Sequence, residues 1–266
     1  MRDPLEGVTP EGTIQTGVDR DRIRPPYRPI VDAAVALARD GRPEVAVYVY
    51  GSVATGRAQI PFSDVDILTI GLPAAEAQEM SRSLSSRFSE QCRAVQFAPG
   101  SDEDFIGPDD QAYGGRVFLH HYCAHLAGPD RDRATAGFPA DRRAARGFNG
   151  DIASRLRVWR SELARSPSDT LGRRVARKTL FAVSGLVSIH DATWTTDREE
   201  ASRRWSQIHP DLGQGLSRLA AWSSGESTPQ GPEIEAMLDA VVEPVVEAFR
   251  DEIGLWRQDQ GDHREP

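Results

Sequence analysis

Asp64 and Asp66 lie two positions apart at the start of a short apolar run, and their spacing indicates metal chemistry. Residues 64–70 (DVDILTI) are rich in β-branched side chains, which predicts a strand. Residues i and i+2 of a strand share a face, so both carboxylates point the same way. Two adjacent carboxylates repel each other unless a cation lies between them. Because Mg²⁺ prefers oxygen ligands of this kind, we expect Asp64 and Asp66 to bind it.

A glycine–serine pair precedes these aspartates. Residues 44–50 (EVAVYVY) predict a buried strand, and Gly51 and Ser52 follow it directly. Gly51 has no Cβ to keep a phosphate away from the backbone. Ser52 offers a hydroxyl and a backbone N–H at the start of a helical turn, where anions bind favourably. A metal site and a phosphate site on neighbouring strand ends predict a centre for phosphoryl or nucleotidyl transfer.

The stretch 47–70 resembles the DNA polymerase β-like nucleotidyltransferase superfamily, in which a strand, a Gly-Ser pair and an Asp-x-Asp motif follow one another. It is most similar to the bacterial streptomycin/spectinomycin adenylyltransferases. Residues 125–129 (HLAGP) and a helical second half extend this similarity weakly. The resemblance implies an Mg²⁺-dependent enzyme that transfers AMP from ATP to a hydroxyl of a small molecule. Aminoglycoside antibiotics are the first candidate acceptors, which would make the protein an antibiotic-resistance enzyme.

The same resemblance implies roles for individual residues. Gly51 and Ser52, with Ser63 beside the acidic pair, hold the nucleotide phosphates. Asp64 and Asp66 bind Mg²⁺. The acceptor hydroxyl then attacks the α-phosphate, and pyrophosphate leaves.

A third carboxylate is normal on the next strand of this family, and here that strand reads RAVQFA (93–98), with Gln96 at the acidic position. An amide accepts no proton and is a poorer ligand for Mg²⁺ than a carboxylate. Three interpretations stay open. An acid of the loop 101–110 takes over, or the acceptor carries its own negative group, or the protein binds nucleotide and turns it over poorly. The last would make it a regulatory protein of the same fold.

Lys178 is the only lysine of the chain, and it lies in a near match to a P-loop, Gly172 to Thr179. We reject the P-loop, because Arg177 replaces the second glycine and no strand precedes it. The segment instead predicts an amphipathic helix on which Arg174 and Lys178 share a face. The resemblance implies that these two cations reach the triphosphate. The alternative is a solvated or ion-paired helix face.

Two further clusters could bear chemistry. Residues 102–110 hold five acids in nine positions, which predicts either a solvated loop or a lip for a cationic aminoglycoside. His120, His121 and His125 fall in a predicted helix, 115–127. His121 and His125 would then share a face, but no second ligand pair follows at zinc-site spacing, so helix packing is favoured over zinc.

The coarse pattern, together with the resemblance, predicts an α+β fold: a small nucleotidyltransferase-type sheet flanked by helices, then an all-helical C-terminal domain. Residues 1–29 predict an irregular arm. The predicted divisions are a nucleotidyltransferase domain at 1–130, a linker at 131–150, a helical domain at 151–256 and a disordered tail at 257–266.

Composition narrows the classes of function. The 266 residues are 39% hydrophobic and 27% charged, which is typical of a soluble globular protein. No apolar run is long enough for a membrane span, and two isolated cysteines indicate a reducing, cytoplasmic location. Residues 1–130 hold 12 basic and 19 acidic side chains, a net charge of −7. This charge suits cations and disfavours nucleic acid. The expected partners are a nucleoside triphosphate and a small hydroxyl-bearing acceptor.

Overall fold

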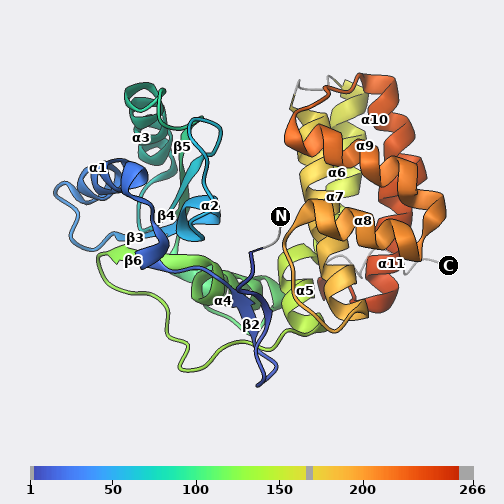
Figure 1. The fold of residues 1–266 in the computed structure, drawn as a ribbon, viewed down its shortest axis with the longest axis horizontal. Coiled ribbons are helices and arrows are strands. Elements are labelled where there is room, and N and C mark those ends of the chain that lie inside the picture. The colour runs from blue at the N-terminus through green and yellow to red at the C-terminus, as the bar shows by residue number, and fades with distance from the viewer. Residues whose placement is uncertain (1–2, 166–169, 258–266) are drawn as a thin grey trace. The chain divides into compact units, whose positions relative to one another are not determined.

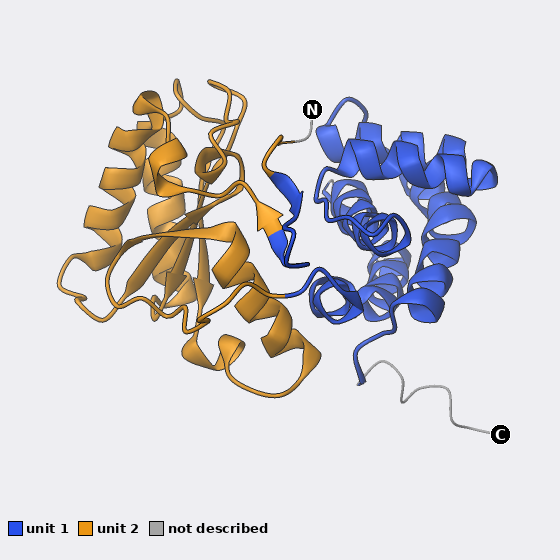
Figure 2. Ribbon diagram, turned by 60° about the horizontal axis from the view of Figure 1, so that its bottom comes forward, with its two compact units in different colours: residues 1–2, 6–14, 139–266 blue, residues 3–5, 15–138 orange. Residues whose placement is uncertain are grey.

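A computed structural model describes residues 3–165 and 170–257, and it confirms the predicted α+β class. The described residues divide into two compact units (Figure 2). We call residues 3–5 and 15–138 the sheet unit, and residues 6–14 together with those from 139 onward the helical unit.

Four strands form the mixed sheet of the sheet unit (Figure 1), in the order β5-β4-β3-β6. β3 pairs antiparallel with β4 and with β6, whereas β4 pairs parallel with β5. The strands are β3 (Ala46–Tyr50), β4 (Val65–Ile70), β5 (Val95–Gly100) and β6 (Cys123–Ala127). The central strands β3 and β4 therefore carry partners on both sides, and both of their faces are covered.

Helices α1 (Arg28–Arg39) and α3 (Ala74–Arg87) cover one face of the sheet, and α4 (Asp110–Tyr122) covers the other. The side of α1 and α3 buries residues such as Val65 and Ile67 of β4. The side of α4 buries Leu68 and Ile70 of the same strand, with Tyr48 of β3. Strand alternation then assigns Tyr50, Asp66 and Gln96 to the α4 side, because each lies two positions from a residue on that face.

Residues 3–29 contain more regular structure than the predicted irregular arm. β1 (Glu6–Val8) and β2 (Ile14–Thr16) form a two-stranded sheet, and two single-turn 3₁₀ helices span Arg20–Arg22 and Pro25–Tyr27. These elements are too short to show a periodic pattern. Three apolar side chains in or next to them are nevertheless buried: Ile14, Ile23 and Tyr27. The prediction of irregular structure was wrong here because burial of single side chains fixes the segment.

The predicted helix 115–127 was also wrong in part, because it merges two elements. α4 ends at Tyr122, and β6 continues directly from Cys123 along the free edge of β3. CAHLA has little intrinsic strand preference, so its conformation comes from pairing with β3 rather than from its own composition. His121 and His125 consequently belong to different elements and share no helix face.

The helical unit is built around α7 (Leu171–His190), whose Val175, Leu180 and Leu186 are fully buried. The other helices are α5 (Arg142–Asn149), α6 (Ile152–Arg165), α8 (Arg198–Ile208), α9 (Gly213–Ser224), α10 (Gly231–Met237), a π-helical turn (Leu238–Val242) and α11 (Glu243–Glu252). α5 lies within residues 131–150, the predicted linker, and packs against α7. Apart from Arg257, the predicted tail 257–266 lies outside the described residues.

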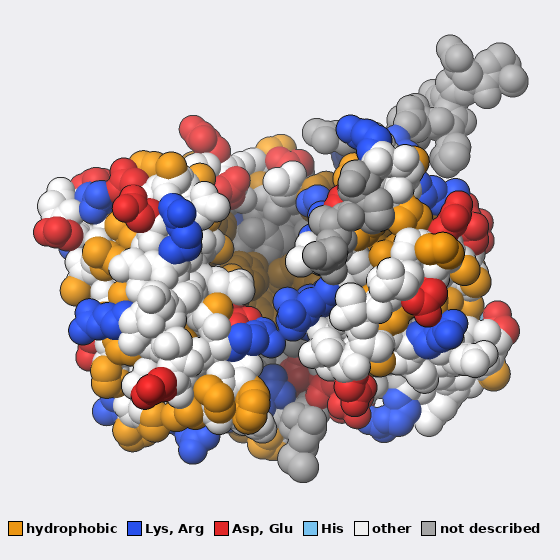
Figure 3. Space-filling view, turned by 90° about the horizontal axis from the view of Figure 1, so that it is seen from above, with side chains coloured by type: hydrophobic (Ala, Val, Ile, Leu, Met, Phe, Trp, Pro, Cys, Tyr) orange, Lys and Arg blue, Asp and Glu red, His pale blue; other side chains and the backbone are white. Residues whose placement is uncertain are grey.

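Within residues 3–165 and 170–257, no helix has both the length and the apolar character needed to cross a membrane. Acidic, basic and apolar side chains are interspersed over the face of the molecule drawn in Figure 3.

Tyr48 ties the sheet to the segment that follows β6. Its hydroxyl donates to Asp130 Oδ1 (2.8 Å) and accepts from the backbone N–H of Arg131 (2.6 Å). Replacing Tyr48 by Phe leaves that N–H without its partner. We expect Tyr48→Phe to lower the free energy of unfolding by about 1–2 kcal/mol, measured by urea denaturation.

Tyr27→Phe is the matched control. Tyr27 is as deeply buried as Tyr48, but its hydroxyl has no hydrogen-bond partner among the described residues. Its removal is expected to be neutral or stabilising, because no bond is lost. Equal losses from the two substitutions would contradict the role given to the Tyr48 hydroxyl.

Candidate active site

The predicted phosphate-binding glycine and the predicted metal-binding aspartate lie in contact. Gly51 ends β3 and opens the one-turn helix α2 (Gly51–Ala54), and the neighbouring Tyr50 pairs with Asp66 across the β3–β4 ladder. A Cβ added at Gly51 would lie 2.6 Å from Asp66 Oδ2, and Gly51 has a left-handed φ of +71°. Both the close approach and the backbone conformation therefore require glycine.

Ser52 and Ser63 bracket the loop between the two strands. The carbonyl oxygen of Ser52 accepts from the N–H groups of Arg57 (2.9 Å) and Ala58 (3.0 Å), which closes the turn after α2. The Ser63 hydroxyl accepts from the N–H of Gln59 (2.9 Å) and so holds the end of the loop beside Asp64. Both serines are half-buried at the mouth of the site. Their contacts with a nucleotide stay a prediction.

Asp64 is held by an arginine that sequence reasoning did not connect with it. Arg93 Nε donates to Asp64 Oδ1 (2.9 Å), and Arg93 Nη2 donates to Oδ2, so the guanidinium takes both carboxylate oxygens. These hydrogen bonds raise the pKa of Arg93. The Asp64 side chain is 12% exposed and that of Arg93 is 45% exposed, so the aspartate is the inner member of the pair.

The strand register places Gln96 where the third carboxylate of the family would be. β4 and β5 pair parallel, with Val65 opposite Val95 and Asp66 opposite Gln96. The Gln96 side chain is exposed and lies on the same face of the sheet as Asp66. Tyr50 shares this face, and burial together with Asp66 raises the pKa of its hydroxyl. Neither neighbour supplies a base at neutral pH.

Two acids of the loop that follows β5 are engaged away from the position opposite Asp66. Asp66 lies opposite Gln96, whereas Gly100, the last residue of β5, lies opposite Ile70, four positions and about 13 Å further along the strands. The loop acids begin only beyond that point. Asp102 Oδ1 pairs with Arg131 Nε (3.2 Å), and Asp104 Oδ2 accepts from the N–H of Ser101 (2.7 Å). The interpretation that this loop supplies the third acid stays a prediction.

The residues at the site fit one divalent cation bound together with phosphate oxygens. Gly51 lies directly against the Asp66 carboxylate. Asp64 immediately precedes β4, and its shared face with Asp66 stays a prediction. Within the described part of the chain, no cluster of three or more histidine, cysteine or acidic side chains could enclose a metal ion. A divalent ion here would have to complete its ligands with water and nucleotide oxygens, as Mg²⁺ commonly does.

Each of the three neighbouring histidines has its own hydrogen-bond partner. His120 Nδ1 lies 2.6 Å from Asp132 Oδ2, and His125 Nε2 lies 3.1 Å from the carbonyl oxygen of Gly128. His121 Nε2 accepts from the backbone N–H of Phe138 (2.8 Å). Burial lowers the pKa of His121 to about 4, which agrees with a neutral ring acting as an acceptor. All three side chains hold local structure of the sheet unit.

The two predicted triphosphate contacts of the helical unit already have acidic partners. Lys178 Nζ lies 2.7 Å from Asp151 Oδ1 and donates to the carbonyl oxygen of Phe148 (2.9 Å). Burial lowers the pKa of Lys178. Arg174 pairs with Glu162. These contacts match the ion-paired alternative for this helix face, and a contact with nucleotide stays a prediction for both residues.

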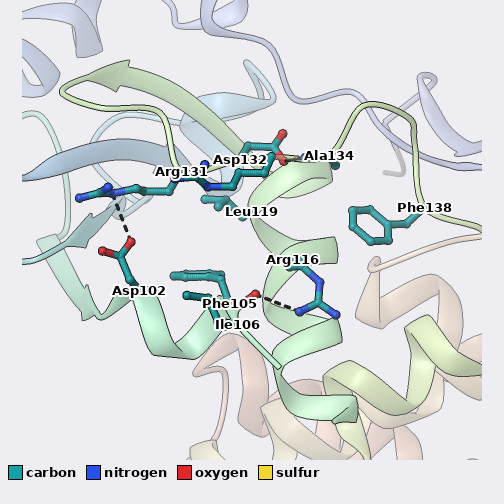
Figure 4. A pocket seen from close by; sticks show the side chains of 10 residues that line it. Asp102, Phe105, Ile106, Arg116, Leu119, Arg131, Asp132, Ala134 and Phe138 are labelled. Carbon is teal, nitrogen blue, oxygen red and sulfur yellow. Dashed lines mark hydrogen bonds and ion pairs between the residues drawn. The ribbon is translucent and has the colours of Figure 1, made fainter. Parts of the chain in front are cut away.

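A pocket lies in the sheet unit between α4 and residues 131–138, which follow β6 (Figure 4). Its volume is about 340 Å³, and Phe105 and Leu119 line it together with Arg116 and the Asp102–Arg131 pair. Arg116 Nη1 donates to the carbonyl oxygen of Phe105 (2.9 Å), so this guanidinium holds the backbone of Phe105 in the lining of the pocket. No motif marked the pocket in the sequence, because it forms only when the segment after β6 folds back over α4.

Comparison with known proteins shows the fold. No protein-family model and no curated protein sequence matches the chain. Among solved structures, the chain is similar to spectinomycin adenyltransferase AAD(9) from Enterococcus faecialis, crystallised with ATP and spectinomycin. The TM-score is 0.55 at 10% identity, over 84% of this chain and 98% of that one. The two chains share one fold. The family resemblance drawn from residues 47–70 is thereby confirmed at the level of the fold.

Gly51 provides a direct test of the contact with Asp66. In Gly51→Ala the new Cβ would push the Asp66 carboxylate aside, in addition to the backbone strain of about 1–2 kcal/mol that any L-residue meets at this φ. We expect Gly51→Ala to lose most of its affinity for MgATP, measured by isothermal titration calorimetry, with a moderate loss of stability.

Gly41→Ala separates the two effects. Gly41 has nearly the same φ, +68°, but a Cβ there would meet no atom within 4 Å. The Gly41 variant should show a similar loss in urea denaturation and unchanged affinity for MgATP. If both variants bind MgATP as tightly as the natural protein, the Gly51–Asp66 contact plays no part in nucleotide binding.

Proposed function

We propose that this protein is a nucleotidyltransferase that transfers AMP from ATP to a hydroxyl group of a small molecule and releases pyrophosphate. The observation that carries the proposal is the contact between Gly51 and the Asp66 carboxylate at the paired ends of β3 and β4. It sets the glycine turn that would bind the phosphates beside the predicted metal-binding pair, Asp64 and Asp66. The shared fold with an adenyltransferase supports it.

The roles of the residues follow from their positions. Gly51 and Ser52 would bind and orient the β- and γ-phosphates at the end of β3. Asp64 and Asp66 would hold Mg²⁺, which when bound neutralises charge on the phosphates and favours attack at the α-phosphate. Ser63, which fixes the loop next to Asp64, and the basic pair Arg174 and Lys178 stay predicted nucleotide contacts. Positioning of nucleotide and acceptor would supply much of the rate.

Aminoglycosides and related aminocyclitols are the first candidate acceptors. The similar solved structure was determined with ATP and spectinomycin, and residues 1–130 of this chain carry a net charge of −7, which favours a cationic acceptor. Resistance to such an antibiotic would then be the biological role, with the predicted cytoplasm as the place where ATP is available. The acidic balance likewise disfavours a nucleic-acid acceptor.

Pyrophosphate release tests the reaction. The protein is incubated with MgATP and each member of an aminoglycoside panel that includes spectinomycin and streptomycin. We expect release that depends on one acceptor and falls at least about 100-fold in Asp66→Asn, because the amide is a poor ligand for Mg²⁺. Circular dichroism checks that the variant folds. Absence of release with every acceptor, or equal release from the folded variant, would remove the proposed reaction.

A nucleotide-binding protein with weak turnover is the second candidate, and Gln96 is the observation that favours it. An attacking hydroxyl must lose its proton, and the amide opposite Asp66 cannot accept one. Help from a general base is typically worth about 10²–10⁴-fold in rate. Slow turnover with intact nucleotide binding would fit a regulatory protein.

Gln96→Glu distinguishes the two candidates. The exposed position opposite Asp66 can accept the carboxylate without disturbing the core. If hydroxyl transfer is the function, we expect the rate of pyrophosphate release to rise by about 10²-fold, because the new carboxylate serves as a base and a metal ligand. Gln96→Ala, which removes the amide and adds no base, should gain nothing. Unchanged turnover in Gln96→Glu with normal MgATP affinity would favour the regulatory protein.

A further inference from the structure

Arg93 is fixed beside Asp64 by the backbone as well as by its side chain. Its N–H donates to the carbonyl oxygen of Ser63 (3.1 Å), and the N–H of Val65 donates to the carbonyl oxygen of Ala94 (2.9 Å). These two bonds join the two residues that precede β5 to the residues on either side of Asp64. The guanidinium therefore reaches the carboxylate as a consequence of strand register, and the pair is part of how the site is built.

The pair leaves Asp64 with no oxygen free of the guanidinium. Both oxygens accept from Arg93, so a metal ion that binds Asp64 through a remaining lone pair would lie close to the guanidinium, and the two positive charges would compete for the carboxylate. A guanidinium fork matches a carboxylate well and forms a strong, charge-assisted pair. With Gln96 neutral, Asp64, Asp66 and Arg93 together carry a formal charge of −1. This local charge gives a divalent ion little attraction unless an anion arrives with it.

The same fork binds phosphate as well as it binds carboxylate. Arg93 is the more exposed member of the pair, with 45% of its side chain exposed against 12% for Asp64. A triphosphate at this end of β4 would offer the guanidinium a new partner and so release Asp64. In this exchange Arg93 has an anionic partner both before and after nucleotide binding.

We propose that Arg93 competes with the divalent cation for Asp64 and then binds a nucleotide phosphate, so that metal and nucleotide enter the site together. The proposal rests on the proposed function in one respect, because it takes the anion to be a nucleoside triphosphate. It makes Arg93 a residue of the nucleotide site and gives the free protein a low affinity for divalent ions.

Binding of Mn²⁺ by the free protein tests the competition. The ion is titrated without nucleotide or acceptor, and bound and free Mn²⁺ are measured by electron paramagnetic resonance. We expect Arg93→Gln to bind Mn²⁺ at least about tenfold more tightly than the natural protein, because Asp64 is freed from a charge-assisted pair. In Arg93→Gln combined with Asp64→Asn the gain should disappear.

Arg42→Gln is the matched control, since Arg42 pairs with Glu76 at a similarly exposed site on the α1 and α3 side of the sheet. It removes the same charge and should leave Mn²⁺ affinity unchanged. The partly exposed Arg93 contributes little to stability, so Arg93→Gln is expected to fold. Unchanged or weaker Mn²⁺ binding by folded Arg93→Gln would overturn the competition. So would an equal gain in Arg42→Gln, because overall charge alone would then explain the effect.

Binding of metal-free ATP in EDTA tests the second half of the proposal. Arg93→Gln should bind ATP several-fold more weakly, because a phosphate partner is lost, whereas Arg42→Gln should bind it normally. Equal ATP affinity in Arg93→Gln would overturn the phosphate role. Neither titration involves turnover. If the natural protein releases no pyrophosphate and Arg93→Gln still gains Mn²⁺ affinity, the competition at Asp64 stands while the proposed reaction fails.

Discussion

The antiparallel pairing of β3 with β4 is the constraint on which the candidate site depends. It sets Tyr50 opposite Asp66 and so brings the turn at Gly51 against the Asp66 carboxylate. A slip of one residue would exchange the two faces of β4. Val65 and Ile67 would then leave the core beneath α1 and α3, and Asp66 would enter it. Because burying an unpaired carboxylate is costly, the apolar residues of the strand enforce the position of the functional one.

The parallel pairing of β4 with β5 decides the charge of the site. The register that places Val95 opposite Val65 also places Gln96 opposite Asp66, and it brings Arg93 to Asp64. A neutral amide and a cation thus occupy positions around the two aspartates. The register between β4 and β5 therefore helps to determine the chemistry of this centre. The two aspartates alone do not determine it.

Much of this arrangement could be predicted from local sequence. The strands near 44–50 and 64–70 follow from β-branched runs, whereas the third strand lies at Val95–Gly100, two residues beyond the predicted 93–98. Contacts set by tertiary pairing could not be found in this way. Strand β6 takes its conformation from β3, and Arg93 meets Asp64 only through the β4–β5 register. The pairing of Lys178 with Asp151 likewise joins α7 to the turn between α5 and α6, a contact that no sequence pattern specifies.

The same contacts explain how two neighbouring carboxylates can coexist in a stable fold. Like charges this close destabilise the protein unless each is compensated. Asp64 is compensated by the Arg93 fork, and Asp66 lies against the backbone of the glycine turn. The chain itself therefore supplies the charge partner of Asp64. A site built in this way can keep its geometry while its ligands exchange, because the strand register and not the metal holds the carboxylates in place.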